Sequence, residues 1–279
     1  PSFRGLAWRG IAGVDILQKL LQETRPYELT PGSTDKAYEE SLAIVVKSLK
    51  NGGKDLAQRF YDIRDIFRSV NIDRSRRRPI IGVVGEIYVR LHSYSNHDIV
   101  RQIEEIGGEA WVAPFGEWIF YCTDRFIANS KRDKKLKNIV IGKLFNAMLK
   151  KDERKLLEPF RDDLLNWHEP STQEVLALSA PYIEPTFEGE SILSIGKAID
   201  YARKGCAGIV NLLPFSCMPG TVVSALSRKV RENQNNIPWL NIDIDGMNEN
   251  NGRSRLEAFI FQTKQYEVQK LQKKEYNFV

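Results

Sequence analysis

The chain contains few of the residues that usually carry covalent, metal or disulfide chemistry. Its 279 residues include only three cysteines, Cys122, Cys206 and Cys217, and three histidines. Three scattered cysteines cannot form the disulfide framework of a small secreted domain, so we expect a reducing compartment. No apolar run approaches the roughly 18 residues of a membrane span, and no signal-peptide pattern is present at the start. These absences favour a cytoplasmic protein with no membrane partner.

Motifs for common nucleotide cofactors and for zinc hydrolysis are absent as well. Segment 82–85 does not continue into G-x-G-x-x-G, and neither G-x-x-x-x-G-K-S/T nor H-E-x-x-H occurs. The formal net charge is +5, and the short basic runs 74–78 and 131–137 are not interleaved with aromatic residues. Such runs usually coat a solvated face, so we expect no nucleic-acid partner. The chain starts with Pro1 instead of Met, which suggests a processed product or a piece of a longer protein.

Hydrophobic residues make up 42% of the chain, which is enough for a substantial core. Apolar side chains recur at three- and four-residue steps over 11–21, 35–49 and 56–67, and prolines and glycines separate these segments. The spacing predicts three amphipathic helices. The charged linker 74–79 ends in proline and marks a predicted domain boundary, so residues 1–75 form a helical lead-in.

After this linker the pattern changes to strands that alternate with helices. The β-branched run 80–84 is typical of a strand buried on both faces of a parallel sheet. The other predicted strands are 110–113, 207–214 and 238–244, and the helices around them are 97–106, 191–203, 221–233 and 253–273. The alternation predicts an α/β fold with a doubly wound, mainly parallel four-stranded sheet in the order 2-1-3-4. Residues 76–279 then form a Rossmann-like domain, with a helical insertion at about 125–190.

Ligands of an open parallel sheet bind beyond the carboxyl ends of its strands, so the loops after the strands are the predicted site. Cys217 is the strongest candidate in these loops, because it follows a buried strand and precedes a helix entered through Pro219 and Gly220. The N–H groups and dipole of such a helix stabilise a thiolate, which can serve as a nucleophile, a redox thiol or a metal ligand. The alternative is an inert cysteine that fills a small hole in the core.

The other two cysteines are weaker candidates. Cys206 enters the strand that Cys217 follows, and extended residues at about 3.3 Å each place the two sulfurs roughly 25 Å apart. We therefore expect Cys206 to be structural. Cys122 lies about 10 Å along a predicted helix from the edge of the sheet. No C-x-x-C spacing is present, whereas an iron–sulfur site normally needs three or four protein ligands.

Several of these segments resemble one known family. Residues 81–121 read IGVVGEIYVRLHSYSNHDIVRQIEEIGGEAWVAPFGEWIFY, and residues 208–246 read GIVNLLPFSCMPGTVVSALSRKVRENQNNIPWLNIDIDG. Together with WRGIAGVDILQKLLQETRPYE at 8–28 and RSRLEAF at 253–259, they are similar to the 2-hydroxyacyl-CoA dehydratases and the CoA-substrate-specific enzyme activase-related proteins that carry a dehydratase-like region. The segment 125–190 is the least distinctive part.

The resemblance implies an oxygen-sensitive iron–sulfur cluster, a 4Fe-4S or double-cubane centre, which receives low-potential electrons from an ATP-hydrolysing activator. Its best-known outcome is radical dehydration of a 2-hydroxyacyl-CoA thioester. Cys217 matches a cluster cysteine of the family, and Cys122 falls near a second one. The pocket-loop residues are Glu86, Tyr88, Asn96, Glu117 and Ser216, of which all but Ser216 match recurrent family positions with no assigned role. The actin-like ATPase motifs of the activator are absent, and the other cluster cysteines of the family would precede Pro1.

The sequence therefore leads to one hypothesis and two alternatives. The hypothesis is a dehydratase-like portion of an iron–sulfur protein, with an incomplete set of cluster ligands and no activity alone. The first alternative is a non-catalytic α/β interaction module of a larger complex, in which the cysteines are packing residues. The second is a CoA or nucleotide binder without a metal.

Overall fold

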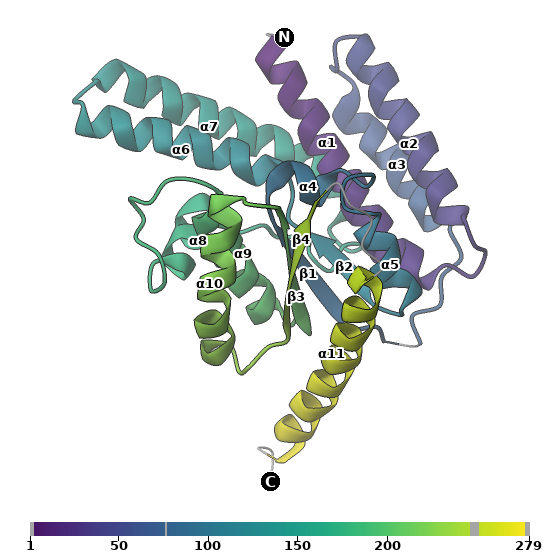
Figure 1. Ribbon diagram of the computed structural model, residues 1–279. Helices are drawn as coiled ribbons and strands as arrows, with labels where there is room; N and C mark the ends of the chain where they lie inside the picture. The colour runs from purple at the N-terminus through teal and green to yellow at the C-terminus, as the bar shows by residue number, and fades with distance from the viewer. Residues whose placement is uncertain (1–2, 76, 246–250, 277–279) are drawn as a thin grey trace. The chain divides into compact units, whose positions relative to one another are not determined.

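The structure is a computed structural model that describes residues 3–75, 77–245 and 251–276 (Figure 1). The chain divides into two compact units. The first consists of residues 1–75 and 114–172, and the second of residues 76–113 and 173–279. Most of the helical segment expected as an insertion at about 125–190 thus groups with the lead-in helices, because its helices pack against α1. No helix among the described residues is both long and apolar enough to cross a membrane.

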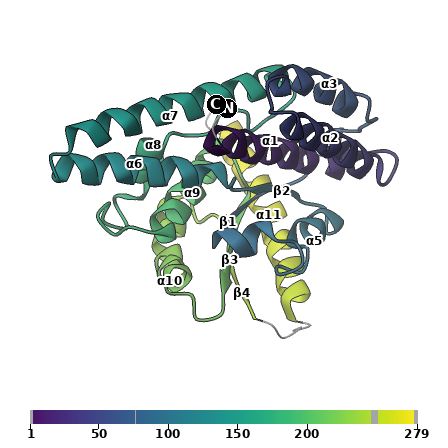
Figure 2. The same ribbon diagram turned by 90° about the horizontal axis from the view of Figure 1, so that it is seen from above.

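Helices dominate the described part of the first unit, which also has one isolated antiparallel bridge between Glu28 and Ile72. Its helices are α1 (Phe3–Thr24), α2 (Ser33–Lys50), α3 (Leu56–Arg68), α6 (Gly116–Arg132) and α7 (Leu136–Leu157), with 3-10 turns η1 (Arg25–Tyr27) and η2 (Glu158–Phe160). Helices α6 and α7 form an antiparallel hairpin, and α7 packs on α1 (Figures 1 and 2). The apolar faces predicted from the helical spacing meet in one core, in which Leu17, Val45, Phe60, Leu149 and Phe160 are fully buried.

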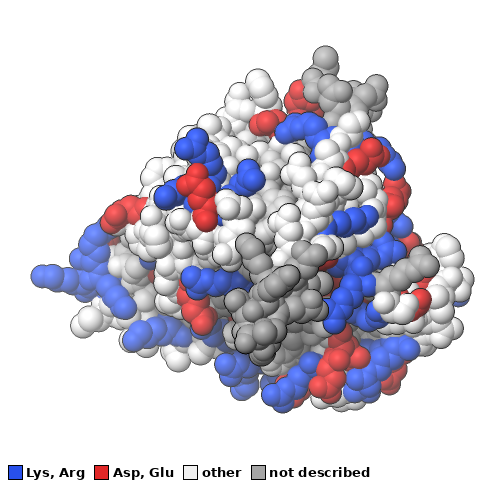
Figure 3. Space-filling view, turned by 90° about the horizontal axis from the view of Figure 1, so that it is seen from below, with Lys and Arg blue, Asp and Glu red and all other residues white. Residues whose placement is uncertain are grey.

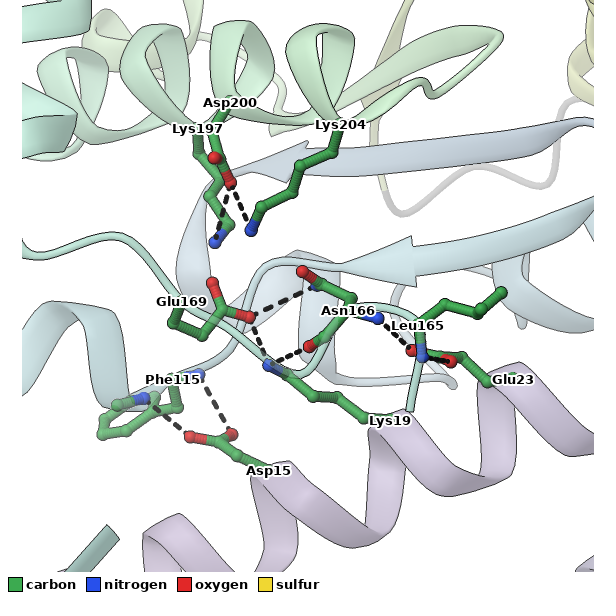
Figure 4. A network of polar contacts seen from close by, with 11 residues as sticks. Asp15, Lys19, Glu23, Phe115, Leu165, Asn166, Glu169, Lys197, Asp200 and Lys204 are labelled. Atoms are coloured by element: carbon green, nitrogen blue, oxygen red, sulfur yellow. Dashed lines mark hydrogen bonds and ion pairs between the residues drawn. The ribbon is translucent and has the colours of Figure 1, made fainter. Parts of the chain in front are cut away.

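A network of polar contacts joins α1 to the distant segment 114–172 of the same unit (Figure 4). The charged side chains Asp15, Lys19 and Glu23 lie one helical turn apart, so they share one side of α1. Asp15 accepts from the N–H groups of Phe115 and Gly116, Glu23 from those of Leu165 and Asn166, and Lys19 pairs with Glu169 and donates to the carbonyl of Asn166. These bonds satisfy backbone groups that packing alone would leave unpaired.

The second unit contains a four-stranded, all-parallel sheet in the order β2-β1-β3-β4, which confirms the predicted topology. The strands are β1 (Ile80–Gly85), β2 (Glu109–Val112), β3 (Gly208–Pro214) and β4 (Trp239–Ile244). The helices are α4 (Ile87–Leu91), α5 (Ile99–Glu105), α8 (Thr172–Ser179), α9 (Glu190–Lys204), α10 (Met218–Asn233) and α11 (Asn251–Tyr276). The predicted strands and long helices are each found within a few residues of their expected bounds.

Successive strand residues point to opposite sides of the sheet, and most of them are apolar. Both faces of the sheet are therefore apolar. Val83 packs with α5 and α11, whereas Val84 packs with Tyr201 of α9. Helices α9 and α10 accordingly cover one face and α5 and α11 the other (Figure 1). Glycine is required at Gly82, where a Cβ would lie 2.5 Å from the Tyr201 ring. The carboxyl ends of all strands are left at one edge.

Charged side chains of both signs lie on one face of the molecule, as Figure 3 shows. On the face seen in Figure 3, Lys and Arg are interspersed with Asp and Glu, in line with the mixed charges of the sequence. Within the second unit, Asp200 on α9 forms an ion pair with Lys204 at 3.0 Å and lies 3.7 Å from the buried ammonium of Lys197 (Figure 4). The buried ammonium thus lies beside a carboxylate, as buried charges in proteins usually do.

Candidate functional site

An open cleft of about 980 Å³ lies at the carboxyl edge of the sheet in the second unit. Its lining residues come from the loop after β1 and from the ends of β3 and β4: Glu86, Tyr88, Val89, Ser93, Tyr94, Ser95, His97, Asp98, Pro214, Ile244 and Asp245. This is the position at which parallel sheets bind ligands. Three of the four predicted loops therefore contribute to one cleft or border it. The remaining loop, residues 114–118 after β2, belongs to the first unit. Residues 246–248 of the loop after β4 lie outside the described residues.

A sharp turn directs the chain from β1 into the wall of the cleft. Gly85 has φ +117°, and a Cβ there would lie 2.0 Å from the carbonyl oxygen of Leu212, so only glycine fits. The carboxylate of Glu86 then accepts hydrogen bonds from the N–H groups of Tyr88 and Val89 and begins helix α4. This short helix stands where the sequence predicted a loop, because five residues are too few to show a helical period.

Asn96 supports the cleft from inside. Its side chain is 3% exposed and donates to the carbonyls of Val89 and Arg90, while its oxygen accepts from the N–H of Ile99. The amide thereby holds the loop between α4 and α5 in one conformation. Of the predicted pocket residues, Glu86 and Tyr88 line the cleft, whereas Asn96 positions the loop that lines it.

Aromatic rings form an exposed stack beside the cleft. The rings of Tyr88 and His92 are stacked with centroids 4.8 Å apart, and Tyr94 meets His92 edge-on at 6.4 Å. Nδ1 of His92 is 2.8 Å from the hydroxyl of Ser95. Tyr88 and Tyr94 are 60% and 87% exposed, so they offer flat apolar surface to a ligand. This stack was not predicted from the sequence, although the four-residue spacing of Tyr88 and His92 is a signal for it.

The charges of the cleft are acidic. Glu86, Asp98 and Asp245 line it with His97, and no Lys or Arg is among the described lining residues. Glu190 of α9 lies near this group. Burial raises the pKa of its carboxyl, and the negative charge of Glu86 adds to the increase. The cleft therefore disfavours a further negative charge and favours uncharged or cationic groups.

Cys217 lies at the rim beside the cleft. It is half-buried and is the N-cap residue of α10, and its N–H donates to the carbonyl of Pro214, a lining residue, at 3.0 Å. Ser216 is exposed and has φ +63°, which turns the chain from β3 into α10. Gly220 lets α10 start directly against β3, since a Cβ there would lie 2.5 Å from that of Leu213. The predicted strand, cysteine and helix junction is present.

The other two cysteines have different environments. Cys206 is 1% exposed at the start of β3, and burial raises the pKa of its thiol far above the usual range. This inert environment agrees with the structural role expected from the sequence. Cys122 lies exposed on α6 of the first unit, one turn after Glu117 and Trp118, and partial burial of the sulfur raises its pKa. Cys122 and Glu117 thus belong to a different unit from Cys217.

The described residues do not contain a complete metal site. No group of three or more His, Cys, Asp or Glu side chains in residues 3–75, 77–245 and 251–276 is arranged to hold a metal ion. Comparison with protein-family models, curated proteins and solved structures found no match for this chain. The geometry and the sequence motifs are therefore the basis for a functional proposal.

Proposed function

We propose that the chain is the dehydratase-like portion of an iron–sulfur protein related to 2-hydroxyacyl-CoA dehydratases and their activators. The observation that carries the proposal is the half-buried thiol of Cys217, placed between the end of β3 and the start of α10. A thiol at a helix N-terminus has the electrostatic setting of a metal ligand. The cleft beside it and the motifs at 81–121 and 208–246 support the same function.

The described residues supply only part of the ligand set that an iron–sulfur cluster needs. An iron–sulfur cluster needs three or four protein ligands, and within the described residues the sheet unit offers one thiol at its rim. The proposal is therefore that Cys217 contributes one ligand and that the remaining ligands come from an upstream segment or a partner. The family resemblance also gives Cys122, on α6 of the helical unit, as a candidate ligand. Because the ligand set is incomplete, no reaction step is assigned to a cluster.

The charge of the cleft limits which part of a CoA thioester it accepts in this proposal. Its described lining residues include three carboxylates and no Lys or Arg, so the diphosphate of CoA would be repelled. The acyl and pantetheine groups are uncharged near the thioester and suit the exposed faces of Tyr88 and Tyr94. The proposal places the acyl end in the cleft and the phosphates outside it, with the ATP-hydrolysing activator as the partner that supplies electrons. A cytoplasmic location belongs to the same proposal.

Anaerobic reconstitution of the full chain with iron and sulfide, in the presence of an added small thiol, tests the role of Cys217. The wild-type chain should bind iron and sulfide and show the visible absorption and EPR signals of a cluster. Cys217→Ser should lose most of the bound iron. Cys206→Ser is the matched control for loss of a thiol and should retain it, provided that circular dichroism shows an intact fold. Equal iron and sulfide content in the Cys217→Ser and wild-type proteins would remove Cys217 from the coordination sphere.

The non-catalytic interaction module gives the opposite result in the same experiment. That alternative requires colourless protein after anaerobic reconstitution, with no difference between the wild-type chain and the Cys217→Ser and Cys122→Ser variants. A CoA or nucleotide binder without a metal would also be colourless, but coenzyme A or ATP would raise its melting temperature. The three functions are therefore distinguishable with one set of proteins.

A further inference from the structure

The positive charge of the protein is concentrated in the α6–α7 hairpin. Residues 131–151 contain eight Lys or Arg and one Asp, a net charge of +7, whereas the whole chain carries +5. The rest of the chain therefore carries −2. Asp133 is already paired with Lys135 at 3.0 Å, and all eight basic residues are exposed. The hairpin is thus a local basic surface on an otherwise slightly acidic chain.

An exposed apolar seam runs along α7 through this basic surface. Leu136, Val140 and Leu144 are 76%, 56% and 68% exposed, and they lie four residues apart on the side of the helix away from the buried Leu149. Lys137 and Lys143 flank the seam, one on each side. Exposed aliphatic side chains in register along two helical turns are typical of a helix that packs against a partner.

The width and charge of the seam distinguish between three kinds of binding partner: a second copy of this chain, a membrane and a helix of another protein. A second copy of this chain would bring two +7 surfaces together, which like-charge repulsion opposes. A membrane-bound helix presents a wide, continuous apolar face. In this seam Ile141, 50% exposed, widens the row of Leu136, Val140 and Leu144 at one place, and Lys137 and Lys143 interrupt the rows beside it. A narrow apolar seam flanked by charges is the geometry of helix-to-helix packing, in which flanking residues of opposite sign set the partner. We propose that the α7 seam docks an amphipathic helix of a partner protein that carries aliphatic residues flanked by Asp or Glu.

The experiment uses the full chain and a synthetic fluorescein-labelled peptide with Leu at alternating third and fourth positions and Glu on both flanks. Fluorescence anisotropy should show that this peptide binds and that added salt weakens the binding. Val140→Ser/Leu144→Ser should weaken the affinity by about tenfold or more, because it removes both central aliphatic groups. Lys137→Glu/Lys143→Glu should weaken it similarly. Phe261→Ser on α11 and Lys229→Glu on α10 are exposed controls that should not change it.

Three results would overturn the proposal. The first is equal binding of a peptide of the same composition whose leucines no longer share one helical face. The second is no peptide binding together with binding to vesicles of phosphatidylglycerol and phosphatidylcholine, which would indicate a membrane surface. The third is a dimer in light scattering that Val140→Ser/Leu144→Ser dissociates, which would indicate a second copy. The substituted side chains are exposed, so unchanged circular dichroism is expected for each variant.

Discussion

Each of the two units has an apolar core, but the units differ in the contacts that join segments far apart in the sequence. In the sheet unit, β-branched strands are buried on both faces, and close packing at glycine positions determines where the elements approach. In the helical unit, the polar side chains of α1 connect segments that are 100 to about 150 residues apart in sequence. Glu23, which is only 2% exposed, receives two of these hydrogen bonds.

This difference determines which substitutions each unit tolerates. The stability that apolar packing contributes decreases gradually when one methyl group is removed. Where two backbone segments are in contact, however, there is no space for an added atom. A buried hydrogen-bonded carboxylate is sensitive in a different way, because its removal leaves several donors without partners. Substitutions of the two kinds should therefore destabilise the units separately.

Gly85→Ala should be the most damaging change in the sheet unit. The new Cβ would meet the carbonyl of Leu212, and φ +117° is unfavourable for alanine, so we expect a loss of about 4 kcal/mol in unfolding free energy. Peptide-resolved hydrogen exchange should show faster exchange in β1 and β3 while α1–α3 remain protected. Gly252→Ala on α11 has open space around it and should be neutral or slightly stabilising. Equal effects of the two substitutions would refute the packing argument.

Glu153→Gln should change how the stability of the helical unit depends on pH. Burial raises the pKa of Glu153 from 4.5 to about 7, with Glu169 and Asp15 adding to the increase and Lys19 and Lys150 opposing it. Because the folded state holds this proton more tightly than the unfolded state, wild-type stability should fall as the pH rises from about 4.5 to about 7. The loss is at most about 3 kcal/mol.

Urea unfolding between pH 4 and pH 8 measures this effect. The Glu153→Gln variant, which cannot ionise, should be flatter over that interval and more stable than wild type at pH 8. Glu40→Gln on the exposed side of α2 is the matched control and should keep the wild-type profile. Parallel profiles for wild type and Glu153→Gln would show that Glu153 does not retain its proton in the folded state.

Glu23→Gln should cost the helical unit about 2 kcal/mol, because a neutral amide replaces the carboxylate that accepts from Leu165 and Asn166. Hydrogen exchange should increase around residues 165 and 166 and leave the sheet protected. Arg59→Ala removes an exposed ion pair with Asp55 and Asp62 and should leave the unfolding midpoint unchanged. If Arg59→Ala were as damaging as Glu23→Gln, burial would not be the reason for the sensitivity of α1.

Local patterns predicted most of the fold, and contacts between distant residues account for what they missed. The β-branched runs and the turn residues after them were sufficient for the strand order β2-β1-β3-β4. The grouping of 114–172 with the lead-in helices depends on bonds such as those of Asp15 to Phe115 and Gly116, which leave no periodic signal in the sequence. The predicted domain boundary at 75–76 coincides with a change of unit.

The candidate site was predictable to a similar degree. The rule that ligands bind beyond parallel strands placed Glu86, Tyr88 and Cys217 at one edge of the sheet, where they are found. It could not separate a lining residue from a supporting one. Asn96 has the polarity of a binding residue, but its amide is used for backbone carbonyls of the loop. Only side-chain contacts make that distinction.

Differential alkylation of the three cysteines tests the role of Cys217 most directly. Iodoacetamide should modify Cys217 in the folded chain and reach the buried Cys206 only after unfolding, as read by mass spectrometry of tryptic peptides. After anaerobic loading with iron and sulfide, Cys217 should become protected. Two results would contradict the proposal that Cys217 is a cluster ligand. One is that Cys217 is as unreactive as Cys206 before loading, and the other is that its reactivity is the same before and after loading.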